Sequence, residues 1–153
     1  MLRAFGEIEK FPVSANGLYT PDNIYIMFED VEINWTWRRD EVKEFDSYIK
    51  AGFGMFDTGQ LSAIFGRTEE EVALMMIDRT LIDGIAKDIT SCFEPYIMLE
   101  NTKINWFWNK RDVIMFDLYY KSGVSVQSIA AKFNRPLEEI VIMTFDRALR
   151  GEL

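Results

Sequence analysis

Aspartate and arginine side chains recur in this sequence in a pattern that could support carboxylate chemistry. Asp46 and Asp117 lie within two predicted helices, and Asp-Arg pairs follow at 78–79 and 146–147. Paired carboxylates can transfer protons or hold magnesium. However, the sequence contains no histidine, no nucleophile motif and no phosphate-binding loop such as G-x-x-x-x-G-K-[ST]. We therefore expect a protein that is not an enzyme and that uses no cofactor and no metal.

The same carboxylates have a structural interpretation, which we prefer. Asp46 and Asp117 lie on or near the apolar faces of their helices, where a partly buried charge needs a partner. Arg67 and Arg135 lie at the turn into a later helix. We expect Asp46 to pair with Arg67, and Asp117 with Arg135, so that the first helix is tied to the third. The two Asp-Arg pairs could form a second such set or a bridge between repeats.

Two clusters of tryptophans and basic residues are the most distinctive feature of the sequence. They consist of Trp35, Trp37, Arg38 and Arg39, and of Trp106, Trp108, Lys110 and Arg111. Cations at the start of a helix oppose its dipole, which suggests another role for them. We expect a surface that contacts an acidic partner or nucleic acid. In the alternative interpretation, which we prefer for the tryptophans, these side chains cover a helical core and the cations are solvated.

The clusters occur twice because the sequence contains an internal repeat. Residues 25–52 align with residues 96–123 at an offset of 71, and 14 of the 28 positions are identical. After a three-residue insertion in the first copy, the similarity resumes over residues 59–82 at an offset of 68. The expected organisation is an N-terminal extension at 1–22, a first unit at 23–87, a linker at 88–91 and a second unit at 92–153.

Apolar residues at intervals of three and four indicate three helices in each unit. The expected helices are 38–51, 58–65 and one beginning near Thr68 in the first unit, and their counterparts in the second unit, including 125–133 and one beginning near Pro136. The spacing from Thr68 to Glu71 fits a capping box. Apolar and β-favouring residues ahead of each first helix predict a short strand or hairpin. The fold class is therefore mainly α, with two tandem three-helix units that each have an aromatic, β-type lead-in.

The run "GVSVQSIAAKFNRPLEEIVIMTFDRAL" from Gly123, the similar "GQLSAIFGRTEEEVALMMIDRTL" from Gly59 and the earlier "WTWRRDE" resemble the Myb/SANT-like group of helix-turn-helix domains. The resemblance implies three-helix units whose third helix enters the major groove of DNA in the members that bind DNA. Here, however, the third-helix segments 68–87 and 136–153 carry formal charges of −3 and −2. A surface that contacts phosphate should be basic.

Composition and hydropathy limit the class of protein further. The formal net charge is −8, Cys92 is the only cysteine and no segment has the length of a membrane span. We expect an intracellular protein, either cytoplasmic or associated with the nucleoid or nucleus, without a membrane partner. The third helices are apolar on several sides, which suggests packing between repeats or a homodimer.

The predicted function is that of a non-enzymatic adaptor or regulator. It would act mainly through contacts with a protein partner, in transcription or another DNA transaction. The alternative is a transcription regulator that binds DNA directly through its local basic clusters.

Overall fold

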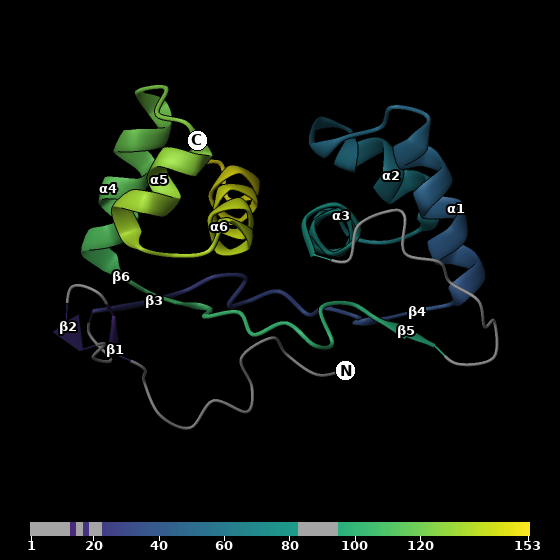
Figure 1. Cartoon of the computed structure of the whole chain (residues 1–153), viewed down its shortest axis with the longest axis horizontal. Helices are drawn as coiled ribbons and strands as arrows, with labels where there is room; N and C mark the ends of the chain where they lie inside the picture. Colours follow the sequence, from purple (N-terminus) through teal and green to yellow (C-terminus); the bar gives the residue numbers. More distant parts are fainter. Residues whose placement is uncertain (1–12, 15–16, 19–22, 83–94) are drawn as a thin grey trace. The chain divides into compact units, whose positions relative to one another are not determined.

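The computed structural model describes residues 23–82 and 95–153, together with the backbone of 13–14 and 17–18. This part of the chain is mainly helical (Figure 1). It divides into two compact units, the first comprising residues 32–82 and 95–103 and the second comprising 23–31 and 104–153. The predicted linker at 88–91, Cys92 and most of the predicted extension at 1–22 lie outside the described residues. The two described pieces of that extension, β1 (Val13–Ser14) and β2 (Gly17–Leu18), pair with each other.

The helices of the first unit follow the sequence patterns closely. The elements are β4 (Thr36–Trp37), α1 (Arg39–Lys50), a 3-10 turn at Met55–Asp57, α2 (Thr58–Phe65), α3 (Glu69–Ile77), a π-helical turn at Asp78–Ile82 and β5 (Tyr96–Ile97). The predicted capping box is confirmed, because Thr68 and Glu71 each accept the other's backbone N–H at 3.1 Å. After α1 the chain turns at Gly52, whose φ of 108° is unfavourable for other residues.

The second unit has the same order of helices. It contains β3 (Ile24–Ile26), β6 (Phe107–Asn109), α4 (Lys110–Lys121), α5 (Val126–Phe133) and α6 (Leu137–Leu149). The predicted serine cap is present, because Ser125 Oγ accepts the backbone N–H of Ser128 at 3.2 Å. Asn134 ends α5 in the left-handed conformation, with φ of 53°.

The lead-in segments form strands, but not hairpins within one copy of the repeat. β3 pairs antiparallel with β6, and β4 pairs antiparallel with β5 (Figure 1). Each unit therefore combines the three helices of one sequence copy with the first strand of the other copy. The expected starts of the two units, at residues 23 and 92, consequently differ from the observed division. Residues 23–31 belong to the second unit and residues 95–103 belong to the first.

An aromatic cluster forms the centre of each unit. In the first unit, the Trp37 ring lies 5.6 Å from Phe45 and 5.7 Å from Phe65, measured between ring centroids. In the second unit, Trp108 contacts Phe116 and Phe133 at 5.7 and 5.2 Å. Three of these four contacts are edge-to-face, and such contacts stabilise a core beyond simple burial.

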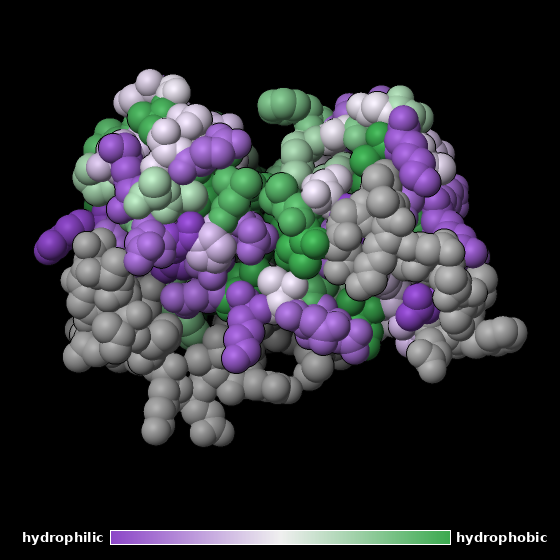
Figure 2. All heavy atoms as spheres, viewed as in Figure 1, coloured by the Kyte–Doolittle hydropathy of each residue, from purple (hydrophilic) through white to green (hydrophobic). Residues whose placement is uncertain are grey.

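Polar side chains cover much of the surface of the helices. On the face drawn in Figure 2, hydrophilic residues are interspersed with hydrophobic ones over both units. Within the described residues, no helix is both long enough and apolar enough to cross a membrane.

Candidate functional site

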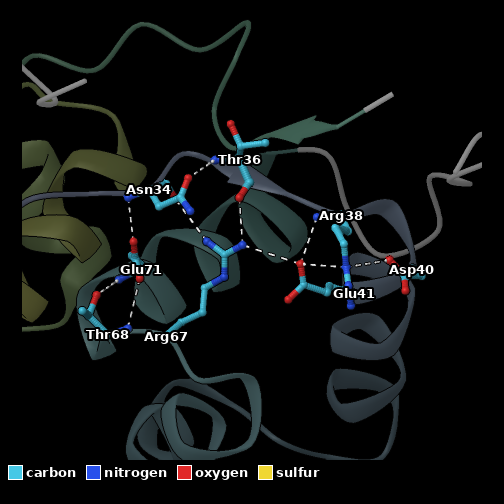
Figure 3. Close-up of polar contacts among 8 residues, drawn as sticks. All are labelled: Asn34, Thr36, Arg38, Asp40, Glu41, Arg67, Thr68 and Glu71. Atoms are coloured by element: carbon cyan, nitrogen blue, oxygen red, sulfur yellow. Dashed lines mark hydrogen bonds and ion pairs between the residues drawn. The ribbon is translucent and has the colours of Figure 1, made fainter. Parts of the chain in front are cut away.

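An arginine at the turn between the second and third helices holds the lead-in segment of the first unit. Arg67 donates hydrogen bonds to the carbonyl oxygens of Asn34 at 3.2 Å and Thr36 at 2.8 Å (Figure 3). Its guanidinium carbon lies 3.9 Å from the centre of the Trp37 ring. Burial lowers the pKa of Arg67, and the charges of Glu41 and Glu71 offset part of that effect. Arg67 thus fixes the strand and its tryptophan against the helices.

The second unit repeats this arrangement. Arg135 donates to the carbonyl oxygens of Asn105 at 3.2 Å and Phe107 at 2.5 Å, and it lies 4.0 Å from the centre of the Trp108 ring. It also forms an ion pair with Glu139 at 2.9 Å. A planar guanidinium can bind two carbonyl groups and stack on an indole at once, which a lysine cannot do.

A buried glutamate at the start of each third helix binds the same lead-in segment. Glu71 accepts the backbone N–H of Asn34 at 2.6 Å (Figure 3), and Glu139 accepts that of Asn105 at 3.0 Å. Both glutamates are buried. The first turn of α3 and the first turn of α6 are therefore occupied by contacts with the protein's own backbone.

The predicted partner of Asp46 is wrong. Its carboxylate binds Arg79 through two hydrogen bonds, at 2.9 and 2.7 Å, and the Arg79 side chain is fully buried. Arg67 reaches the lead-in backbone and Glu41 instead, the latter at 3.7 Å. Although burial lowers the pKa of Arg79, its hydrogen bonds with Asp46 and Tyr96 raise the pKa above the ordinary value.

The predicted partner of Asp117 is wrong in the same way. Asp117 binds Arg147 through hydrogen bonds of 3.1 and 2.7 Å, while Arg135 binds the lead-in segment. The hydrogen bond with Asp117 is the main cause that raises the pKa of Arg147. These aspartates still tie the first helix of each unit to the third-helix segment, but they do so through Arg79 and Arg147, the arginines of the Asp-Arg pairs at 78–79 and 146–147.

A tyrosine on the exchanged strand completes each ion-pair cluster. In the first unit, the hydroxyl group of Tyr96 donates to Asp78, and the other oxygen of Asp78 accepts the N–H of Leu99 at 3.3 Å. Leu99 has φ of 57°, so this carboxylate stabilises a residue in the left-handed conformation. Arg79 donates to the Tyr96 oxygen at 3.3 Å.

The corresponding cluster in the second unit uses Tyr25. Tyr25 donates to Asp146 at 2.5 Å, and Asp146 accepts the N–H of Phe28 at 2.9 Å. Phe28 also has a positive φ, of 55°. Burial, followed by the hydrogen bond with Asp146, raises the pKa of Tyr25 to about 12. The Asp-Arg pairs at 78–79 and 146–147 therefore anchor strands from the other sequence copy.

The tryptophans serve packing more than contact. Trp37 and Trp108 are fully buried, Trp106 is buried and Trp35 is half-buried. The first three side chains are therefore inaccessible to a partner in this structure, and the alternative interpretation of a covered core describes them. The indole N–H groups of Trp37 and Trp108 have no hydrogen-bond partner in the part of the chain that is described.

The predicted basic contact residues lie in two different environments. Arg38 is exposed and forms ion pairs with Asp40 at 3.3 Å and Glu41 at 3.6 Å (Figure 3), and Arg39 is half-buried. Lys110 and Arg111 are exposed at the start of α4, and no carboxylate among the described residues forms an ion pair with either. The two repeats therefore present different charges at equivalent positions.

Several residues with a clear structural role were not among the predicted sites. They are Tyr25 and Tyr96, Asn34 and Asn105, and Glu71 and Glu139. Each pair is identical in the two copies of the repeat, and Glu71 also belongs to the predicted capping box. Among the described residues, no cluster of three or more acidic, cysteine or histidine side chains could hold a metal ion. Comparisons with models of protein families, with curated proteins and with solved structures find no match for this chain.

Proposed function

We propose that this chain is a non-enzymatic adaptor or regulator built from two three-helix, helix-turn-helix-like units. It acts mainly through protein contacts, in transcription or another DNA transaction. Its described surface offers helix faces and charged side chains for such contacts, while its most distinctive polar clusters join one element of a unit to another.

The observation that carries this proposal is that side chains at the start of each third helix are hydrogen-bonded to the lead-in segment of the same unit. A helix that reads DNA uses residues near its N-terminus to reach base edges. Here Glu71 in the first turn of α3 binds the lead-in, together with Arg67 just before that helix. Glu139 and Arg135 do the same at the start of α6. These side chains would have to break their hydrogen bonds with the lead-in backbone before they could contact DNA.

The charge of the same turns supports the proposal. Glu69, Glu70 and Glu71 form the first turn of α3, and Glu138 and Glu139 lie in that of α6. These carboxylates complement the helix dipole. They would repel a phosphate backbone, whose binding depends on lysine and arginine.

Direct DNA binding is the second candidate, and one observation favours it. Lys110 and Arg111 are exposed at the start of α4 without an ion-pair partner in the described residues. Together with Arg38 and Arg39, they could contact phosphates and add two weak sites together.

A DNA titration of the full chain distinguishes the two candidates. Fluorescence anisotropy with labelled duplex and single-stranded DNA would be measured at low and moderate salt. The control is a variant with alanine at Arg38, Arg39, Lys110 and Arg111. We expect no binding by either protein. Salt-sensitive binding by the wild type that disappears in the variant would replace the adaptor function with direct DNA recognition.

A further inference from the structure

Two large apolar side chains of α4 are exposed on the surface of the second unit. Ile114 is 63% exposed and Leu118 is 54% exposed. They are four residues apart, so they lie one above the other on the same side of the helix, about 6 Å apart along its axis. Single exposed apolar residues are common on proteins, but two adjacent ones on one helix face are the usual form of a helix-docking anchor.

Three basic residues surround this pair. Lys110 and Arg111 lie about one turn before Ile114, and Lys121 lies about one turn after Leu118. At 100° per residue all five side chains fall within an arc of about 100° around the helix. All three cations are exposed. We call this set of five residues, Lys110, Arg111, Ile114, Leu118 and Lys121, the α4 surface.

The acidic residues of α4 do not neutralise this surface. Asp117 forms its ion pair with Arg147 at 2.7 Å, and Asp112 is buried. The charge that α4 presents outward is therefore positive, on a chain whose formal net charge is −8.

Comparison with the first copy of the repeat shows that the fold does not require Arg111, Ile114 or Leu118, whereas Lys110 and Lys121 have basic counterparts there. At the equivalent positions of α1, Asp40 replaces Arg111, Lys43 replaces Ile114 and Ser47 replaces Leu118. All three are exposed, and α1 has the same length as α4. The same helix is thus built with an ordinary polar outer face in one unit and with an apolar, basic face in the other.

We infer that the α4 surface is the docking site for an acidic amphipathic helix of a partner protein. This inference rests on the proposed function as a protein-binding adaptor and names the chemistry of the partner. The partner helix would place two apolar side chains between those of Ile114 and Leu118, in the manner of ridges packing into grooves. Its glutamates or aspartates would lie one turn before and after, opposite Lys110, Arg111 and Lys121.

The charges argue against a second copy of the chain as the occupant. In a symmetric dimer the same patch meets itself, so three cations would face three cations. They also argue against a purely electrostatic ligand. A phosphate backbone would gain from the cations, but it would cover Ile114 and Leu118 without any apolar group to bury against them.

The test uses the full chain and a labelled synthetic peptide. The probe is a stapled helical peptide of about 16 residues, with leucines at one helix face and glutamates flanking them. The matched probe has lysine at every glutamate. Anisotropy titrations would compare the wild type with a double variant, Ile114→Lys and Leu118→Ser, which introduces the residues of the first copy. Because both positions are exposed, the circular dichroism spectrum and thermal midpoint of the variant should match those of the wild type.

We expect the wild type to bind the acidic probe and not the basic one, and the double variant to bind about tenfold more weakly or worse. A transplant supplies the reciprocal experiment. Asp40→Arg, Lys43→Ile and Ser47→Leu, added to the double variant, should restore binding by moving the surface to α1.

Two outcomes overturn the inference: no binding of the acidic probe by the wild type, or equal binding by the wild type and the double variant. Titration with duplex DNA in parallel separates this failure from failure of the proposed function. If the wild type binds neither the acidic peptide nor DNA, only the docking role of the α4 surface is refuted. Salt-sensitive DNA binding refutes the adaptor function itself.

Discussion

Tyr96 donates a hydrogen bond from its hydroxyl group to Asp78, and this contact joins the lead-in strand of the second sequence copy to the third-helix segment of the first. Tyr25 and Asp146 make the equivalent contact in the other unit. Tyr96 is the first residue of β5 and Tyr25 is the middle residue of β3. Both carboxylates also accept the backbone N–H of a residue with positive φ. The Tyr-Asp contacts are therefore the points at which each exchanged segment is anchored.

The Tyr96→Phe variant should lose stability although it keeps the aromatic ring. Asp78 is buried, so removal of the hydroxyl group leaves a carboxylate oxygen without one of its donors, at a cost of about 1–3 kcal/mol in the free energy of unfolding. Urea denaturation measures this change, and hydrogen exchange at the Leu99 amide should become faster. Unchanged exchange at Leu99 would contradict an anchoring role.

The stability of the protein should depend on pH through Tyr25 in the alkaline range. The pKa of Tyr25 is about 12 in the folded chain, against 10.0 for a free tyrosine. Below pH 10 the group is protonated in both states and its contribution to stability is complete. As the pH rises from 10 towards 12, the unfolded state loses its proton first, so the free energy of unfolding falls.

The Tyr25→Phe variant is the control for this titration. Lysines and other tyrosines also ionise in the same range, so the quantity of interest is the difference between the wild type and the variant. Urea denaturation should show that this difference is smaller at about pH 11, between the unfolded and folded pKa values of Tyr25, than at about pH 9, below both. A constant difference would mean that Tyr25 is not stabilised in its protonated form.

Asp46→Asn should destabilise the chain more than Asp117→Asn. The Arg79 side chain is fully buried, whereas that of Arg147 is 12% exposed. Breaking a buried pair leaves an uncompensated charge, which costs about 3–5 kcal/mol, and access to water reduces this cost for Arg147. Urea denaturation of the two variants provides the comparison. Equal losses would show that burial does not distinguish the two pairs.

Two phenylalanines of the first unit should respond to truncation in opposite ways. Phe45 is fully buried against Trp37, so Phe45→Ala should cost about 3–5 kcal/mol in the free energy of unfolding. Phe56 is 99% exposed, and Phe56→Ala should change stability by no more than about 0.5 kcal/mol. Thermal melts of both variants test this contrast, and a large loss for Phe56→Ala would show that its side chain packs in solution.

The helices could be predicted from the sequence because their signals are local. The period of apolar residues, the capping box at Thr68 and Glu71, and the turn at Gly52 each depend on neighbours a few residues away. The predicted segment 58–65 coincides with α2, and 38–51 differs from α1 by one residue at each end.

The strand exchange could not be predicted because the competing segments have the same sequence. Residues 25–27 and 96–98 both read Tyr-Ile-Met, so either segment offers the same tyrosine to either Asp-Arg pair. The choice of partner depends on the path of the whole chain. The predicted partner of Asp46 was wrong because Arg67 and Arg79 both flank the third helix. The spacing of the residues in the sequence does not show which of the two lies closer to Asp46.

Only some residues of the α4 surface could be predicted from the sequence. Lys110 and Arg111 were singled out because cations oppose the dipole at the start of a helix. Ile114 and Leu118 were not, because apolar residues in a helix are expected to face a core. Only the exposed position of these two side chains on α4 makes them part of a candidate surface.

The exchange of lead-in strands also bears on the origin of the chain. A single ancestral copy, with its lead-in and three helices, could have formed the same unit by giving its strand to a second molecule and receiving one in return. Duplication and fusion of the gene would join two such molecules into the present chain and preserve the reciprocal strands β3–β6 and β4–β5. On this view one polypeptide here is equivalent to an ancestral dimer, and a protein cut between its sequence copies would yield two halves that each depend on the other to fold.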